Sequence, residues 1–206
     1  MRWTVLVPIR SLPSAKSRLA SSVPAEVFER LVTAIRADTL DAVRAADPVA
    51  RVVVVGDLPG PGVTLVQTSP GLNGALRDGA SHAVEWWPDD GVAALVGDLP
   101  ALRPRELAEA LDAAAGHPAA FVPDRTGTGT TTLAARPGAV LDPQFGPGSA
   151  ARHRAVATEL HAAAGLRHDV DTADDLAAAA ALGLGPHTSI LFDVDGGFLL
   201  PADAAL

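Results

Sequence analysis

Three aspartates follow apolar, strand-like segments and are the first candidates for chemistry in this sequence. Asp98 follows the run 92–96, Asp169 lies at the end of the segment 166–170, and Asp171 directly follows that segment. A carboxylate beside a buried strand needs a partner, and Mg²⁺ is a good one. Because side chains alternate along a strand, Asp169 and Asp171 are predicted to share one face, where they repel each other unless a cation bridges them. We therefore expect these carboxylates to converge on one hard metal ion through oxygen ligands.

These aspartates also have structural explanations that need no metal. Asp98 can cap the next helix, although that helix is predicted to begin several residues later, and Asp171 can serve only the N-terminus of the helix that follows it. Asp193 and Asp195 repeat the Asp-x-Asp spacing within the C-terminal tail, where short motif matches often arise by chance.

A cationic loop follows the first strand-like segment and is the candidate phosphate site. Between residues 8 and 19 it carries three cations and three serines. Lys16 and Arg18 can neutralise a polyphosphate while backbone N–H groups complete the cradle. The spacing matches neither the Walker A loop nor the Gly-x-Gly-x-x-Gly dinucleotide fingerprint. The alternative is an ordinary surface loop with solvated cations.

Three Gly-rich segments offer further groups that can bind ligands. Gly71 and Asn73 stand at the start of a predicted helix, where the backbone can be approached closely and an amide can meet a base or ribose. The segments 124–132 and 145–149 can hold a small carboxylate or phosphate through N–H and O–H groups. Alternatively, Asn73 is a simple N-cap and the other two segments are turns. The number of threonines in 124–132 favours ligand binding.

Strand-like and helical segments alternate along most of the chain. The predicted strands are 3–7, 51–55, 63–67, 92–96, 119–122, 131–135 and 166–170, and the predicted helices are 24–46, 73–87, 103–115, 150–164 and 172–182. This alternation predicts an α/β fold with an open, mostly parallel sheet and helices on both faces. Ligands of such sheets bind outside the carboxyl ends of the strands, where the candidate residues lie. Residues 1–185 are predicted to form one domain, and 186–206 a tail of unassigned role.

The composition argues against several classes of function. The net charge is −8 and no stretch is densely basic, which disfavours a nucleic-acid partner. The absence of cysteine excludes disulfides, thiolate metal sites and cysteine nucleophiles, and the six histidines are scattered without metal-ligand spacing. The sequence shows neither a signal peptide nor an apolar run of membrane-spanning length, so we expect a cytoplasmic location and no membrane partner.

The ordered set of these motifs resembles a known enzyme family. The motifs occur in the order found in the 2-phospho-L-lactate / phosphoenolpyruvate guanylyltransferase family of deazaflavin coenzyme F-420 biosynthesis; they are residues 7–10, 16–19, 71–73, 98–100, 124–130, 145–149 and 169–172. The likeness covers roughly residues 3 to 183, and the full set is far more specific than any single motif. Arg10, Gly97 and Thr131 depart from the Lys, Ala and Asn that are common in the family.

The resemblance implies a GT-A/Rossmann-like nucleotidyltransferase fold in three layers, with a mixed sheet, and it implies Mg²⁺ as cofactor and GTP as substrate. The residues that it implies form four groups: metal ligands Asp98, Asp169 and Asp171; catalytic residues Lys16, Arg18 and Asp98; nucleotide-binding residues Lys16, Arg18, Gly71 and Asn73; and acid-binding residues Thr130, Gly146 and Ser149.

The implied reaction transfers GMP from GTP to a phosphorylated three-carbon acid and releases pyrophosphate. The acid's phosphate has a second pKa of about 6, so it is an anionic nucleophile at neutral pH and needs no general base. Two alternatives stay open: a nucleotidyltransferase acting on molybdopterin or a sugar phosphate, and a non-catalytic GTP-binding subunit. The sequence does not decide between phosphoenolpyruvate, 2-phospho-L-lactate and 3-phosphoglycerate. A homodimer and a downstream deazaflavin transferase are candidate partners.

Overall fold

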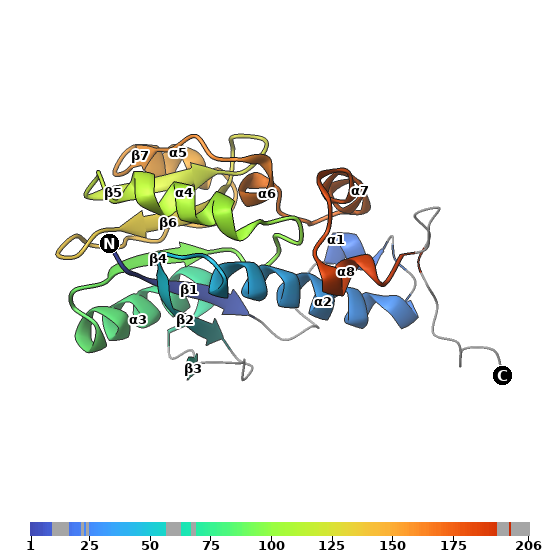
Figure 1. Cartoon of the computed structure of the whole chain (residues 1–206), viewed down its shortest axis with the longest axis horizontal. Coiled ribbons are helices and arrows are strands. Elements are labelled where there is room, and N and C mark those ends of the chain that lie inside the picture. The colour runs from blue at the N-terminus through green and yellow to red at the C-terminus, as the bar shows by residue number, and fades with distance from the viewer. Residues whose placement is uncertain are drawn as a thin grey trace.

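A mixed β-sheet forms the centre of the computed structural model (Figure 1), which describes residues 1–9, 17–21, 23, 25–56, 63–66, 69–192 and 198. Within these residues seven strands follow the order β3-β2-β1-β4-β6-β5-β7, and β6 alone runs antiparallel to its neighbours. The strands are β1 (Trp3–Ile9), β2 (Val49–Gly56), β3 (Val63–Val66), β4 (Gly91–Leu95), β5 (Ala119–Pro123), β6 (Thr130–Ala135) and β7 (Thr158–Glu159). The predicted mostly parallel, mixed sheet is confirmed.

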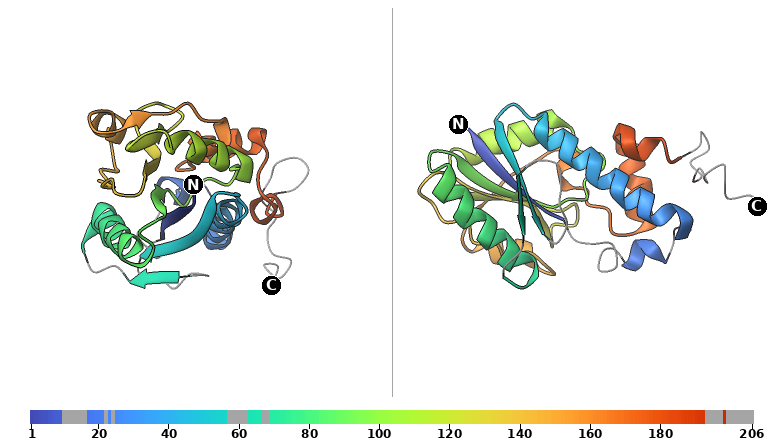
Figure 2. Two further views of the ribbon diagram at one scale, coloured as in Figure 1. Left: turned by 60° about the vertical axis from the view of Figure 1, so that its left-hand side comes forward. Right: turned by 90° about the horizontal axis from the view of Figure 1, so that it is seen from below.

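Helices cover both faces of this sheet and complete three layers. The long helices α2 (Ala25–Arg44) and α3 (Gly71–Trp86) lie on opposite faces (Figure 2). Helix α4 (Pro104–Ala114) shares the α2 face, and α5 (Ser149–Arg154) shares the α3 face. The other helices in the described part of the chain are α1 (Ser17–Ala20), α6 (Ala164–Arg167), α7 (Ala173–Leu182) and α8 (Pro186–Ser189). None of the helices described has the length and apolar character that crossing a bilayer requires.

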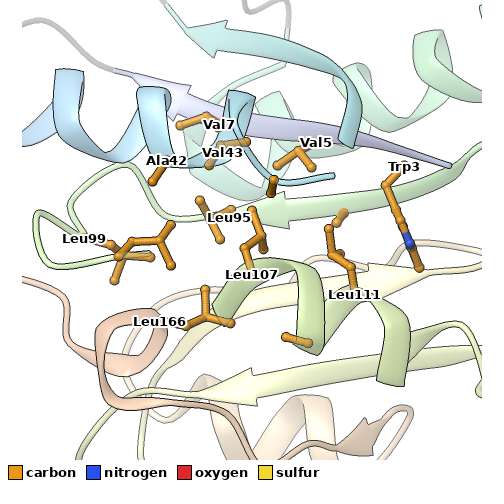
Figure 3. Close-up of a cluster of buried hydrophobic side chains, with 14 of the residues drawn as sticks. Trp3, Val5, Val7, Ala42, Val43, Leu95, Leu99, Leu107, Leu111 and Leu166 are labelled. Carbon is orange, nitrogen blue, oxygen red and sulfur yellow. The ribbon is translucent and has the colours of Figure 1, made fainter. Parts of the chain in front are cut away.

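Alternating burial along β1 explains why both faces are covered. Val5 and Val7 pack with α2 and α4, whereas Leu6 packs with α3, because successive side chains of a strand point to opposite faces. Figure 3 shows the apolar cluster between the sheet and helices α2 and α4, in which Leu107 and Leu111 of α4 face the sheet. Burying each such side chain stabilises the fold by about 1.5–3 kcal/mol, so the strand ends are held on a firm core.

The strand order places a topological switch point at the carboxyl ends of β1 and β4. The chain runs from β1 outward to β2 and β3, and then returns to the other side of β1 as β4. Adjacent parallel strands whose connections leave in opposite directions open a crevice between them. The loop after β4 carries Asp98, whereas residues 10–16 of the predicted phosphate loop lie outside the described residues.

Two predictions between residues 150 and 170 are wrong. The predicted helix 150–164 ends at Arg154, and the chain then forms β7 beside β5, where the N–H of Leu160 donates to the carbonyl of Phe121 at 2.9 Å. This pairing overrides the helix propensity of the many alanines. The predicted strand 166–170 is instead the single turn α6 followed by irregular residues. A short apolar run does not distinguish a strand from a buried helical turn, and here Leu166 is buried in the core.

The segment after Gly185 packs onto α2 through a buried carboxylate. Asp38 accepts the backbone N–H of His187 at 2.9 Å and that of Thr188 at 2.8 Å, and Leu191 joins the apolar cluster around α2. Helices α7 and α8 therefore lie beside the α1 and α2 end of the molecule (Figure 1). Asp193 and Asp195 lie outside the described residues.

Candidate active site

Two segments from distant parts of the sequence meet just beyond β4. The N–H of Val170 donates to the carbonyl of Asp98 at 3.1 Å, and the N–H of Leu99 donates to Oγ1 of Thr39 at 2.9 Å. Leu99, Val170 and Thr39 are all buried, so these bonds fix the backbone on both sides. The structure thereby brings Asp98 beside the segment 169–171. That segment is irregular, so the expected alternation of Asp169 and Asp171 along a strand does not apply.

Asp169 has a strongly perturbed carboxyl group. Burial, followed by the nearby charges of Asp98, Asp171 and Asp124, raises the pKa of Asp169 from 3.8 to about 7. Asp169 is half-buried, and Asp171 is exposed. Like charges gathered in this way repel each other, and an opposite charge placed among them relieves that repulsion. The carboxylates after β4 and α6 therefore form a site that attracts a cation.

The chemistry of these donors fits a hard divalent cation. Carboxylate oxygens suit Mg²⁺ and Mn²⁺, and Mg²⁺ commonly takes one or two protein carboxylates while substrate phosphates supply further ligands. Among the residues that the structure describes, no three His, Cys, Asp or Glu side chains are arranged to hold an ion by themselves. A divalent cation here would therefore need ligands in addition to the carboxylates of the described residues.

Of the residues predicted to bind phosphate and nucleoside, the structure describes Gly71 and Asn73 fully and the other two only in part or not at all. Lys16 lies outside the described residues, and Arg18 lies in α1, where its side chain is not described. Gly71 begins α3 with a φ of 78°, a left-handed conformation that favours glycine. A Cβ added at Gly71 would meet no atom of the described residues within 4 Å, so the space on that side of the residue is empty.

Asn73 binds protein backbone through both groups of its amide. Nδ2 donates to the carbonyl of Phe145 at 3.0 Å, and Oδ1 accepts the N–H of Phe145 at 2.8 Å. Asn73 is not the N-cap of α3, because Pro70 occupies that position. This pair of bonds ties α3 to the segment 145–149, a connection that the sequence did not suggest. Asn73 therefore links the predicted nucleoside side of the site to the predicted acid side.

One carboxylate organises the Thr-rich loop, residues 124–130 between β5 and β6. Asp124 accepts hydrogen bonds of 2.9–3.0 Å from the hydroxyl of Thr126 and from the N–H groups of Thr128 and Gly129. A Cβ at Gly129 would lie 2.5 Å from Oδ2 of Asp124, so this compact turn has no room for a side chain there. Since the charge of Asp124 also reaches Asp169, the turn lies beside the carboxylate site.

An ion pair joins the Thr-rich loop to α7. Arg125 contacts Asp175 at 2.6 Å, and the Asp175 carboxylate also accepts the N–H and hydroxyl of Thr172 in a reciprocal capping box. Arg125 is exposed, and the charges of Asp169 and Asp124 act on its guanidinium. The guanidinium of Arg125 therefore lies near these carboxylates, although the sequence analysis assigned Arg125 no role of its own.

The predicted acid-binding residues form a buried hydroxyl pair next to a histidine. Oγ of Ser149 donates to Oγ1 of Thr130 at 3.1 Å, and the N–H of Ser149 donates to the carbonyl of Gly146 at 3.0 Å. Nδ1 of His153 lies 2.8 Å from the same Thr130 oxygen. The N–H of Ala150 donates to the carbonyl of Thr128, which joins the two loops. Sequence reasoning missed His153, although its position four residues after Ser149 indicates a shared helix face.

This three-layer arrangement, with helices on both faces of a mixed sheet, is a nucleotidyltransferase fold. The structure of 4-diphosphocytidyl-2C-methyl-D-erythritol synthase superposes with a TM-score of 0.57 at 14% identity, covering 88% of this chain and 98% of that one. The structure of Rv0371C from Mycobacterium tuberculosis H37Rv was solved as a complex with manganese. It superposes with a TM-score of 0.54 at 17% identity, covering 86% of this chain and 97% of that one. At these identities the likeness concerns the fold.

Sequence comparison identifies the family more narrowly. Residues 3–190 match the family described as Guanylyl transferase CofC like. A phosphoenolpyruvate guanylyltransferase from Streptomyces scabiei (strain 87.22) is 48% identical over 205 residues, which cover 92% of this chain and 95% of that protein. The chain therefore belongs to the CofC-like guanylyl transferase family, and it is an enzyme of nucleotidyl transfer.

Proposed function

We propose that this chain transfers GMP from GTP to phosphoenolpyruvate in coenzyme F-420 biosynthesis. The products are a GDP-linked three-carbon acid and pyrophosphate. The name of the Streptomyces scabiei relative supports phosphoenolpyruvate as the acceptor, and the family supports guanylyl transfer. The observation that carries the proposal is the meeting of Asp98, just beyond β4, with the segment of Asp169 and Asp171 that follows α6, beside the Thr-rich loop.

In this proposal Asp98, Asp169 and Asp171 hold Mg²⁺ together with the phosphates of GTP. The bound ion supplies positive charge that offsets the crowding of two anionic reactants. A divalent cation in a fold of this kind is supported by the manganese complex of Rv0371C. The raised pKa of Asp169 supports it further, because burial and the neighbouring carboxylates together make an opposite charge favourable there.

The chain's other residues bind and orient the two substrates. Lys16 and Arg18 bind the GTP phosphates, while Thr130, Gly146 and Ser149 hold the acid through hydroxyl and backbone groups. An oxygen of the acid's phosphate then bonds to the α-phosphorus of GTP, and the bond from that phosphorus to the β-phosphate oxygen breaks. The phosphate is already ionised at neutral pH, so the residues need only align it and exclude water.

Replacing Asp98 tests the proposal. Asp98→Asn keeps the size of the side chain and removes its charge, so turnover of GTP and phosphoenolpyruvate with Mg²⁺ should fall by about 100-fold or more, as for other electrostatic groups at a reacting centre. The matched control is Asp112→Asn, which removes an exposed carboxylate from α4 and should retain wild-type turnover. Full activity of Asp98→Asn would show that this carboxylate does not serve the reaction.

A panel of acceptors distinguishes the alternatives. Pyrophosphate release with phosphoenolpyruvate, but much less with 2-phospho-L-lactate, 3-phosphoglycerate, a sugar phosphate or molybdopterin, would support the proposed substrate. Release only with a sugar phosphate or molybdopterin would assign a different transferase. Binding of GTP without pyrophosphate release from any acceptor would indicate a non-catalytic subunit.

A further inference from the structure

Both ring nitrogens of His153 are bonded within the protein. The backbone N–H of Gln144 donates to Nε2 at 3.0 Å, and Nδ1 lies 2.8 Å from Oγ1 of Thr130. The ring is fully buried and packs beside those of Phe121 and Phe145, with centroids 5.9 and 5.3 Å away. The orientation of this imidazole is therefore fixed from several sides.

The bond from Gln144 determines which nitrogen of His153 carries the proton. A backbone N–H can only donate, so Nε2 must present its lone pair. Burial, followed by the charge of Arg152, lowers the pKa of His153 from 6.5 to about 4, so the ring is neutral at neutral pH. Its single proton then stands on Nδ1, and Nδ1 donates to Thr130.

The Thr130 hydroxyl consequently accepts two hydrogen bonds, one from His153 and one from Ser149. A hydroxyl has two lone pairs and one proton, so both lone pairs are used and the proton remains to be donated. In the described part of the chain no acceptor is placed to receive it. Thr130 is 7% exposed, so an unsatisfied hydroxyl proton here is unfavourable until a ligand accepts it.

We infer that His153 is a positioning residue that fixes the Thr130 hydroxyl as a hydrogen-bond donor toward an anionic group of the acid substrate. This inference rests on the proposed function, because it takes the acid to bind at Thr130 and Ser149. With the opposite tautomer, Thr130 would donate to His153 and present a lone pair to the anion, which repels it. His153 thus selects an anionic ligand without touching it, and Gln144 in turn fixes His153.

Two substitutions separate this role from simple packing. His153→Asn places an amide N–H near the position of Nδ1 and keeps a hydrogen-bond donor to Thr130. His153→Gln places an amide oxygen near the position of Nε2, so it keeps the acceptor for the Gln144 N–H but loses the donor to Thr130. His153→Gln should weaken phosphoenolpyruvate binding about tenfold, the effect of one hydrogen bond to a charged group. His153→Asn should recover most of this affinity, and neither variant should alter GTP affinity.

Titration calorimetry with Mg²⁺ measures both affinities without turnover. If both variants lost affinity for phosphoenolpyruvate and GTP alike, in step with a lower melting temperature, His153 would be a packing residue and the inference would fall. Unchanged phosphoenolpyruvate affinity in His153→Gln would also overturn it. Calorimetry measures binding and not turnover, so the two hypotheses can fail separately. A wild-type protein that releases no pyrophosphate would refute the proposed function alone. The difference in phosphoenolpyruvate affinity between His153→Asn and His153→Gln would still decide the inference.

The tautomer itself provides a second test on the wild-type protein. In ¹⁵N-labelled protein, the two-bond couplings between ring nitrogens and carbon-bound protons distinguish the Nδ1–H form from the Nε2–H form. We expect His153 in the neutral Nδ1–H form at neutral pH, with or without substrate. Observation of the Nε2–H form, or of a doubly protonated ring, would overturn the inference.

Discussion

Asp169→Asn should stabilise the protein above neutral pH when no divalent cation is bound. The folded-state pKa of Asp169 is raised from 3.8 to about 7, so the folded chain holds a proton that the unfolded chain has lost. The stability that this proton gives is complete below about pH 4 and is lost as the pH rises to about 7. The full rise in pKa corresponds to at most about 4 kcal/mol. Rotation of the carboxylate toward water should reduce this to about 1–2 kcal/mol.

Thermal unfolding at several pH values, with a chelator present, measures this effect. For a chain of this length, 1–2 kcal/mol corresponds to a rise in melting temperature of about 2–8 °C at pH 8, and the gain should shrink toward pH 4. The control Asp112→Asn should show no such pH dependence. Mg²⁺ with GTP should stabilise wild type more than Asp169→Asn. A destabilising effect of Asp169→Asn at pH 8 without metal would refute the electrostatic reasoning.

Two further substitutions test the supporting structure. Asp90 precedes β4, at the end of the strand away from the site, and its buried carboxylate pairs with Arg2 at 3.1 Å and with Arg51. Asp90→Ala should lower the free energy of unfolding in urea by about 2 kcal/mol and leave GTP affinity unchanged. A loss of stability below a few tenths of a kcal/mol would contradict this. Asn73→Ala removes both bonds to Phe145 and should raise the KM for the acid while lowering stability by about 1–2 kcal/mol. An effect of Asn73→Ala on GTP alone would instead favour direct contact with the nucleoside.

The central strands of the fold could be predicted because their residue pattern leaves few alternatives. The segments 3–7, 51–55 and 92–96 lie within β1, β2 and β4 apart from Val96, since apolar runs buried on both faces suit parallel strands. The segment 150–164 could not be predicted in this way. Its alanines favour a helix locally, but pairing of β7 with β5 is a tertiary interaction that local propensity does not contain.

The site was predictable as far as strand ends determine it. Asp98 follows β4, so its place at the carboxyl edge of the sheet could be predicted. Its approach to Asp169 and Asp171 was expected from a strand at 166–170 that does not form, and it depends instead on the backbone bond from Val170 to Asp98. The roles of Asn73 and His153 could not be read from the sequence. Asn73 binds a backbone 72 positions away, and the direction of the His153 bonds depends on the amide of Gln144.

The position of the divalent cation tests the central claim most directly. A crystal grown with Mn²⁺, an unreactive GTP analogue and phosphoenolpyruvate would reveal the metal by its anomalous scattering. We expect the ion at about 2.2 Å from a carboxylate oxygen of Asp98 and from one of Asp169 or Asp171, with nucleotide phosphates as further ligands. An ion bound away from all three carboxylates would contradict the account.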